Sequence, residues 1–396
     1  MITRVRSMLG RTRPSLVIVV CVALLLGSGV VMVLASSPYS SLVTYGSVWS
    51  VFLRQVIWIA GGVVMAVVAL LVPTAAIRKL RYILLGGGFI LLLAVLVPGV
   101  GQSVSGSSRW IALGPITIQP SEIMKFAWCV FAADLLSRRT GDGWKVKDVL
   151  VPLLGTLSVA CALIVKQPDL GTTIVIVAMT VAMMVASGLP VSVVVKVVGA
   201  MGVIGAVLAF AAPYRRARLL SFVHPFAHAY SSGYQVVQSL VSFGTGGVTG
   251  VGLGRGAAQW GFLPHAHTDF IFSIVGEQTG IIGTLLIVGL MLLLLLMGLR
   301  IASKAVGKFE SLLAMGITCW LAAESLINMG AALGILPVTG IPLPFVSYGG
   351  SSMLITMAAV GVLLRITRDS ERGFRVIDGG RMKVSMNHPV FTAPVG

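Results

Sequence analysis

One acidic residue in the C-terminal half of the chain stands where it could do chemistry at a membrane surface. Asp269 ends the run Leu263-Pro-His-Ala-His-Thr-Asp269 and directly precedes a very long apolar stretch. No other carboxylate occurs between residues 213 and 268, but the stretch holds several arginines: Arg215, Arg216, Arg218 and Arg255. A carboxylate can accept a proton from a hydroxyl group, and guanidinium groups bind phosphate. The pattern predicts chemistry on an anionic lipid.

Two other interpretations of the same run stay open. Thr268 and Asp269 are both favourable N-cap residues immediately before an apolar helix, so Asp269 could serve the helix alone. His265, His267 and Asp269 could together bind a divalent cation such as Mg²⁺ or Mn²⁺, but a His-x-His pattern is a weak metal signal. We therefore assign no cofactor and no metal ligand from the sequence.

The composition defines the class of protein that must position these residues. The chain has 396 residues, of which 57% are hydrophobic and 10% charged, and its mean hydropathy is +0.99. These values exclude a soluble globular protein and indicate a polytopic membrane protein.

Apolar stretches long enough to cross a bilayer as helices recur along most of the chain. We expect an all-α fold with ten transmembrane helices, at 16–35, 49–71, 82–98, 121–137, 149–165, 171–188, 190–212, 270–299, 311–335 and 346–366. A short N-terminal segment, 1–15, precedes this transmembrane domain of residues 16–370. The loop 213–269 between the seventh and eighth helices is the only large one, and residues 371–396 form a flexible tail.

The distribution of basic residues predicts the orientation. With both termini in the cytoplasm, most of the 29 lysines and arginines fall in internal segments, as the positive-inside rule requires. The large loop is then extracellular. The net charge of +17 is explained by topology and by contact with anionic membrane lipids, so no nucleic-acid partner is needed.

A minority of basic residues would lie on or near the outer side, and these are functional candidates. They are Arg54, Arg109, Lys125, Lys166, Arg215, Arg216, Arg218 and Arg255. Arg54 and Lys125 lie inside predicted spans, where an unpaired charge costs about 2.5–3.5 kcal/mol, so each is expected to face a polar cavity. Snorkelling of the side chain to the membrane surface is the alternative.

Three short motifs supply further candidates for binding an anionic substrate. Glu122 and Lys125 lie three residues apart on one helix face, which fits either an internal ion pair or a phosphate anchor. Arg109 precedes Trp110, which could form an aromatic platform for a sugar or simply anchor the loop at the interface. The turn Lys166-Gln-Pro-Asp-Leu-Gly171 exposes Lys166 and Asp169 to the same cavity or ties them to each other.

The segment from Pro337 to Ser352 contains three prolines and no charge. Irregular backbone at membrane depth must be buried in protein or line a cavity. We expect a re-entrant segment that shapes the lipid site and contributes Ser347 and Tyr348 to it, with simple loop packing as the alternative.

Four separated motifs, taken in order, resemble those of the SEDS glycosyltransferases of bacterial wall synthesis. They are Gly106-Ser-Ser-Arg-Trp-Ile111 with Gln119-Pro-Ser-Glu-Ile-Met-Lys125, then Lys166-Gln-Pro-Asp-Leu-Gly171, then Gly233-Tyr-Gln-Val-Val-Gln-Ser239 through Thr268-Asp-Phe-Ile-Phe272, and then Leu336 through Ser352. The resemblance covers residues 16–370. The segments Val33-Leu-Ala-Ser-Ser37 and 233–239 are more similar to the division branch of this family than to the elongation branch.

The resemblance implies a GT-C-like fold and the polymerisation of lipid II, a disaccharide-peptide on undecaprenyl pyrophosphate, on the outer face of the bacterial cytoplasmic membrane. It also implies a class B penicillin-binding transpeptidase of the FtsI type and other divisome proteins as partners, at the division septum. Such chemistry needs a base for the acceptor hydroxyl and cations for the leaving diphosphate. The position of Asp269 matches the residue that is thought to be catalytic in the family.

Three residues depart from the family pattern. His265 stands where many relatives have glutamate, Gln278 follows Glu277 where many have a second glutamate, and Glu324 stands where glutamine is common. A second acid beside Asp269 is therefore missing. Two other classes of function stay open, a lipid II flippase or transporter and a scaffold of the division machinery without catalysis.

Overall fold

A computed structural model describes residues 14–104, 107–114, 116–138, 145–211, 216 and 222–379. The helices before the first strand are α2 (Pro14–Ser36), α3 (Pro38–Tyr45), α4 (Ser50–Leu71), α5 (Thr74–Lys79) and α6 (Arg81–Ala94). Strands β1 (Gly101–Val104), β2 (Ser107–Leu113) and β3 (Ile116–Ile118) follow. The remaining elements are α7 (Pro120–Arg138), α8 (Val146–Lys166), α9 (Leu170–Ala186), α10 (Val191–Ala211), η1 (Phe226–His228), α12 (Tyr234–Gly246), η2 (Ala258–Trp260), α13 (Ile271–Lys304), α14 (Lys308–Ala332) and α15 (Gly350–Gly379).

Each of the ten predicted stretches overlaps a helix. Six helices in the described part of the chain are long and apolar enough to cross a membrane: α2, α4, α8, α13, α14 and α15. Helices α6, α9 and α10 give shorter apolar segments. Helix α7 is in neither group, and it carries Glu122, Lys125 and Asp134 among its apolar residues.

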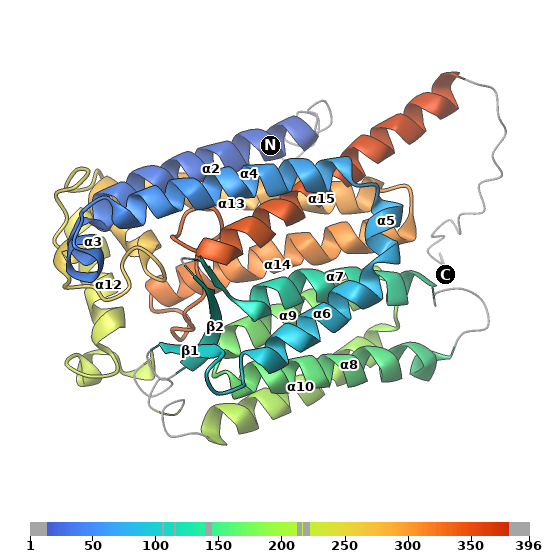
Figure 1. Ribbon diagram of the computed structural model, residues 1–396, viewed down its shortest axis with the longest axis horizontal. Coiled ribbons are helices and arrows are strands. Elements are labelled where there is room, and N and C mark those ends of the chain that lie inside the picture. Colours follow the sequence, from blue (N-terminus) through green and yellow to red (C-terminus); the bar gives the residue numbers. More distant parts are fainter. Residues whose placement is uncertain are drawn as a thin grey trace, which may run out of the picture.

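The helices run roughly side by side, and the short elements gather at the ends of the bundle (Figure 1). Helices α3 and α12 and the strands lie towards one end, and α5 lies at the other. Helix α14 is central, with 72% of its most apolar window buried, whereas only 17% of the corresponding window of α4 is buried. Helix α4 therefore presents most of its surface to the surroundings of the bundle.

A small sheet corrects the prediction of an all-α fold. Strands β1, β2 and β3 form an antiparallel sheet in that order, between α6 and α7. Ile111 in the middle strand pairs with Gly101 on one side and with Ile118 on the other. The sequence missed these strands because they are too short to show a clear alternation of polar and apolar residues.

Helix α13 is interrupted inside its predicted span. Gly280 has φ 66° and ψ −161°, which is not helical. The glycine-rich segment after α12 bonds to the interrupted helix: the amides of Val251 and Gly252 donate to the carbonyl oxygens of Glu277 and Gln278, at 3.0 and 3.1 Å. An interrupted helix is tolerated in an apolar environment where such partners satisfy its backbone groups.

The last helix differs from its prediction at both ends. Helix α15 begins at Gly350, later than expected, because residues 333–349 form the irregular segment that the prolines indicated. It continues to Gly379 and projects beyond the bundle (Figure 1). The predicted flexible tail is therefore helical from 371 to 379, and residues 380–396 lie outside the described part of the chain.

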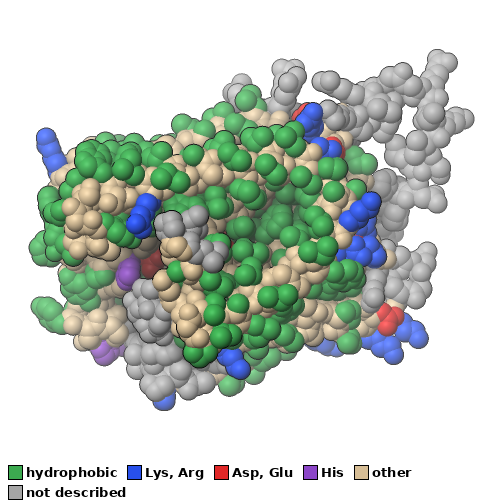
Figure 2. All heavy atoms as spheres, in the orientation of Figure 1, with side chains coloured by type: hydrophobic (Ala, Val, Ile, Leu, Met, Phe, Trp, Pro, Cys, Tyr) green, Lys and Arg blue, Asp and Glu red, His purple; other side chains and the backbone are tan. Residues whose placement is uncertain are grey.

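Charged side chains concentrate at the ends of the bundle. Hydrophobic side chains cover most of the visible face along the helices, and Lys and Arg side chains gather at the end that carries α5 (Figure 2). At that end Asp134 of α7 forms ion pairs with Arg78, Arg81 and Arg138, at 2.6, 2.8 and 2.8 Å. A basic end of this kind is typical of the cytoplasmic side of a membrane protein.

Candidate active site

Asp269 lies in a tight turn directly before α13. The carbonyl oxygen of His265 accepts hydrogen bonds from the amides of Thr268, Asp269 and Phe270, at 3.2, 3.1 and 3.3 Å. Phe270 occupies the N-cap position of α13, and Ile271 is the first helical residue. Asp269 therefore precedes the cap position that the sequence allowed for it, and its side chain is half-buried.

The irregular segment 333–349 is fastened to this turn by hydrogen bonds. Asn328 of α14 donates to the carbonyl oxygens of both Asp269 and Ile341, at 2.8 and 2.7 Å. The hydroxyl of Ser347 donates to the carbonyl oxygen of Thr268 at 2.5 Å, and it accepts the amide of Leu343 at 2.8 Å. Ser347 is buried, and its hydroxyl links the irregular segment to the turn that carries Asp269.

Gly340 brings Asp269 and Arg109 together. A Cβ atom added at Gly340 would lie 3.6 Å from Asp269 Oδ2 and 3.8 Å from Arg109 Nη1. Gly340 has φ +76°, a conformation that residues with a side chain rarely adopt. The carboxylate proposed from the sequence as a base and one of the predicted cations therefore both approach the same glycine.

The guanidinium group of Arg109 is held by the turn between α8 and α9. Its Nε donates to the carbonyl oxygen of Gln167 at 3.1 Å, and its Nη2 donates to that of Pro168. Two of its three nitrogens are thus fixed, and Nη1 is the one directed to Gly340. Trp110, its neighbour on β2, is half-buried.

Asp169 has a structural place in the same turn. It is buried and caps α9, because its side chain accepts the amide of Thr172 at 3.1 Å. Its other oxygen accepts hydroxyl groups of Thr172 and Ser121, at 2.8 and 3.2 Å. The structure therefore does not pair Asp169 with Lys166, which is exposed at the end of α8.

Lys125 is buried between two carboxylates. Its Nζ donates to Glu122 Oε1 at 2.8 Å and to Glu324 Oε1 of α14. Only 1% of the Lys125 side chain is exposed, and the Trp320 ring lies 5.0 Å from Nζ. This geometry supports the ion-pair interpretation of Glu122 and Lys125, since no part of the ammonium group is free to meet a substrate in this arrangement.

Glu277 anchors the glycine-rich segment rather than facing the site. Its carboxylate accepts the amide of Ala257 at 2.8 Å and that of Ala258 at 3.3 Å. A Cβ at Gly256 would come within 2.3 Å of Glu277 Oε2, so the segment passes closely over the acid. Arg255 lies in the same segment and is exposed.

His267 and Tyr348 form a second set of contacts at the turn. The amide of Tyr348 donates to the carbonyl oxygen of His267 at 2.9 Å, and the two rings lie 5.8 Å apart. Burial, together with the nearby His265, lowers the pKa of His267 to about 4. His267 is therefore neutral at physiological pH, and its Nδ1 lies 3.4 Å from the Ser40 hydroxyl.

Three arginines that the sequence predicted as substrate-binding residues have no described contact with this site. Arg215 and Arg218 lie outside the described residues, and Arg216 is described only as an exposed residue. In the part of the chain that the structure describes, no three His, Cys, Asp or Glu side chains are placed to hold a metal ion. His265, His267 and Asp269 therefore do not form the ligand set that the sequence allowed.

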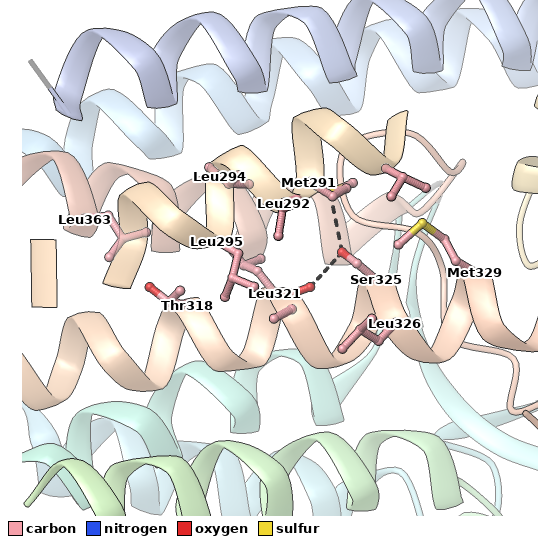
Figure 3. Close-up of a pocket in the computed structure, with 12 residues that line it drawn as sticks. Met291, Leu292, Leu294, Leu295, Thr318, Leu321, Ser325, Leu326, Met329 and Leu363 are labelled. Carbon is pink, nitrogen blue, oxygen red and sulfur yellow. Dashed lines mark hydrogen bonds between the residues drawn. The ribbon is translucent and has the colours of Figure 1, made fainter. Parts of the chain in front are cut away.

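A separate apolar cavity of about 150 Å³ lies between α13 and α14. Most of its lining side chains come from these two helices, with Leu363 from α15, and its two polar side chains, Thr318 and Ser325, are already hydrogen-bonded (Figure 3). The Ser325 hydroxyl donates to the carbonyl oxygen of Leu321, and that of Thr318 donates to Ala314, both at 2.7 Å. The cavity has no titratable lining residue and offers no group for acid–base chemistry.

Asn328 is a site residue that the sequence analysis missed. Its side-chain amide fixes two carbonyl oxygens, those of Asp269 and Ile341. The available signal for Asn328 was a polar amide within a predicted membrane span. A polar side chain in a membrane span usually has a specific partner.

The chain is similar to known proteins of one family. Residues 15–372 match the family described as "Cell cycle protein", which comprises FtsW, RodA and SpoVE. A probable peptidoglycan glycosyltransferase FtsW from Saccharophagus degradans is 40% identical over 89% of this chain and 92% of its own length. The stage V sporulation protein E of Bacillus subtilis is 38% identical over 91% of this chain and 98% of its own length.

Solved structures give the same result for the fold. A chain from a structure of a peptidoglycan synthase complex superposes with a TM-score of 0.74 and 29% identity, over 89% of this chain and 97% of that chain. The rod shape determining protein RodA of Thermus thermophilus superposes with a TM-score of 0.67 and 27% identity, over 89% and 96% of the two chains.

Proposed function

Because the chain belongs to the family of FtsW, RodA and SpoVE, we propose that it is a peptidoglycan glycosyltransferase that polymerises lipid II into β-1,4 glycan strands during cell division. In this proposal ten helices cross the cytoplasmic membrane, both termini are cytoplasmic, and residues 213–269 face outward. The basic cluster around Asp134 at the opposite end from α3 and α12 supports this orientation.

One observation carries the assignment of the site: Asp269 Oδ2 and Arg109 Nη1 both lie within 4 Å of the position that a Cβ atom would take at Gly340. A base and a cation directed at one small space are the two groups that glycosyl transfer to a hydroxyl requires. Asp269 is the proposed general base. Arg109 is the proposed cation at the leaving diphosphate, and its orientation is set by Gln167 and Pro168.

The reaction then proceeds by a single displacement. The acceptor sugar hydroxyl attacks the anomeric carbon of the donor, and Asp269 takes its proton. The bond from that carbon to the diphosphate oxygen breaks, and the diphosphate leaves with the electron pair on the face opposite to the attacking oxygen. The configuration of the carbon is therefore inverted. The positive charge of Arg109 stabilises the charge that develops on the leaving group.

The proposed partners follow from the relatives. Many relatives are named FtsW, and one structural neighbour comes from a peptidoglycan synthase complex. We therefore propose a class B penicillin-binding transpeptidase of the FtsI type as partner, and the division septum as the location. Binding to other division proteins belongs to the same proposal.

A flippase or transporter finds less support in the described acids. Glu122 and Glu324 are both paired with Lys125, and Glu277 is bonded to the amides of Ala257 and Ala258. Carboxylates that carry ions or protons across a membrane usually face a cavity. These three are engaged in holding helices and a loop together.

The proposal predicts that Asp269→Asn abolishes polymerisation without unfolding the protein. The amide is nearly the same size as the carboxylate but cannot accept the proton, and removal of a general base lowers rates by about 10²–10⁴-fold. The assay measures glycan strands formed from labelled lipid II by the chain in complex with its transpeptidase, whose cross-linking is blocked by a β-lactam. Equal strand formation by Asp269→Asn and the unaltered chain would contradict the assignment.

A further inference from the structure

Arg54 is an exposed cation near the outer end of the least covered of the long helices. It lies in the second turn of α4, and only 17% of the most apolar window of this helix is buried. On the neighbouring face Leu53, Ile57 and Val64 are 55%, 68% and 61% exposed. A lipid that approaches from the bilayer would therefore meet an apolar helix surface with Arg54 at its end, where headgroups lie.

Arg54 has aromatic neighbours but no acidic one. Its guanidinium carbon lies 4.1 Å above the centre of the Tyr45 ring, and the group lies close to the side chain of Tyr348. Within the described residues no ion pair joins Arg54 to a carboxylate. Basic residues usually lie on the cytoplasmic side, whereas Arg54 would lie near the outer side. Because no ion pair among the described residues neutralises its charge, the position favours an anionic ligand.

Tyr348 connects Arg54 to the turn of Asp269. The Tyr348 ring contacts His267, and its amide donates to the carbonyl oxygen of His267, two residues before Asp269. Burial raises the pKa of the Tyr348 hydroxyl, so that group stays protonated beside Arg54. Arg54 is therefore held at the end of segment 333–349 that carries Tyr348.

Arg109 approaches the same turn from a different element and at a different place. It extends from β2, is bonded to the turn between α8 and α9, and faces Gly340 beside Asp269 Oδ2. Arg54 extends from α4 and meets Tyr348 instead. Two cations are thus placed along one segment, Arg109 beside Asp269 and Arg54 beyond the His267 ring.

Strand polymerisation requires two lipid-linked diphosphates at once. In the donor, the diphosphate is attached to the carbon that reacts, so it must lie next to the base. In the acceptor, the reacting hydroxyl belongs to the far sugar of a disaccharide, so its diphosphate lies a disaccharide length away from the base. A polymerase therefore needs two cationic places at unequal distances from its general base.

We propose that Arg54, with Tyr45 and Tyr348, binds the diphosphate of the acceptor lipid, while Arg109 serves the donor. The planar guanidinium group can bind a phosphate through two parallel hydrogen bonds, and the Tyr45 ring fixes the plane of that group. The Tyr348 hydroxyl supplies a further hydrogen-bonding group. This inference rests on the proposed function and adds a second substrate subsite to it.

The first experiment measures the initial rate of strand formation against lipid II concentration, with the complex of the chain and its transpeptidase and with a lipid-linked oligosaccharide as donor. Arg54→Gln should raise the KM for lipid II about tenfold or more, because it removes charge-assisted hydrogen bonds, and should leave kcat largely unchanged. Arg54→Lys keeps the charge without the planar fork and should give an intermediate KM. The KM for the oligosaccharide donor should not change.

Lys304→Gln is the matched control, because Lys304 is an exposed cation at the opposite end of α13. It removes the same charge and should leave both KM values unchanged. An unchanged lipid II KM in Arg54→Gln would overturn the proposal. An equal rise in Lys304→Gln would do the same, since the effect would then come from net charge rather than from a subsite.

A binding measurement separates this inference from the assignment of the base. Fluorescent lipid II is titrated into the complex that carries Asp269→Asn, with and without Arg54→Gln, and thermal unfolding is recorded for both. Weaker binding at an unchanged unfolding temperature supports the subsite. Equal binding, or weaker binding with a lowered unfolding temperature, refutes it. Activity of Asp269→Asn would contradict the proposed base, yet the same titration would still report on Arg54.

Discussion

At the residue scale, the reactive side chain is positioned mainly through main-chain groups. The turn that carries Asp269 closes on a single carbonyl oxygen, that of His265, and Asn328 holds the carbonyl oxygen of Asp269 itself. Such contacts fix where the backbone lies while leaving the carboxylate directed at the space beside Gly340. Precise placement of a base depends on supporting hydrogen bonds of this kind.

His267 makes the stability of this turn dependent on pH. Its pKa is lowered to about 4 from 6.5 by burial, so the folded protein resists its protonation while the unfolded chain does not. The unfolded state thus binds more protons between these two values. The contribution of a neutral His267 is complete above about pH 6.5 and is lost as the pH falls towards 4.

We therefore expect His267→Gln to flatten the pH dependence of stability. The unfolding temperature of the unaltered chain in detergent should fall between pH 6.5 and pH 4 more steeply than that of the variant. Thermal unfolding at a series of pH values measures this difference. His228→Gln is the control, because His228 lies in the short helix η1, away from this turn. Parallel curves for His267→Gln and the unaltered chain would contradict the expectation.

At the element scale, α12 and α13 are joined through glycines that leave no room for side chains. A Cβ at Gly246 would lie 2.0 Å from the carbonyl oxygen of Gly276, and one at Gly250 would lie 2.2 Å from that of Gln278. These close approaches allow the glycine-rich segment to supply hydrogen bonds where α13 is interrupted at Gly280. Helix α13, which begins shortly after Asp269, is therefore stabilised by hydrogen bonds from the glycine-rich segment that follows α12.

Gly246→Ala should destabilise this junction, and Gly244→Ala should not. Both residues lie in α12, but a Cβ at Gly244 would meet nothing within 4 Å. Overpacking against rigid backbone costs about 1–3 kcal/mol, whereas alanine in an open helical position is slightly favourable. The unfolding temperatures of the two variants test this, and an equal loss in both would show that the close contact at Gly276 is not responsible.

At the scale of the whole molecule, charge and apolar surface support the proposed orientation in the membrane. Helix α5, whose Arg78 pairs with Asp134, lies at one end of the bundle, and α3 and α12 lie at the other (Figure 1). Between the ends the visible surface is mostly hydrophobic (Figure 2). The site would thus face the outside of the cell, where polymerisation of the wall takes place.

Labelling of introduced cysteines would test this orientation. Tyr230 in the large loop is 100% exposed, and Lys304 is exposed at the far end of α13. A membrane-impermeant maleimide should modify Tyr230→Cys in intact cells and Lys304→Cys only after permeabilisation. The unaltered chain, whose cysteines all lie within helices, serves as the control. The reverse pattern of labelling would show that the orientation is inverted.

The sequence by itself determined the class of protein, the approximate positions of the helices and the main candidate for catalysis. The bilayer imposes the same requirements on every span: a minimum apolar length, and lysines and arginines mainly on the cytoplasmic side. Both features can be recognised directly in the sequence. The motif around Asp269 was readable because its residues are adjacent in the chain.

Only the tertiary structure decided which candidates meet. Arg109 and Asp269 converge on Gly340, and Lys125 is enclosed by Glu122 and Glu324 rather than exposed to a substrate. Asp169 caps α9 and accepts hydrogen bonds from Ser121 and Thr172. These outcomes depend on side chains from helices distant in the sequence, and helix packing sets those distances through contacts that no local pattern encodes.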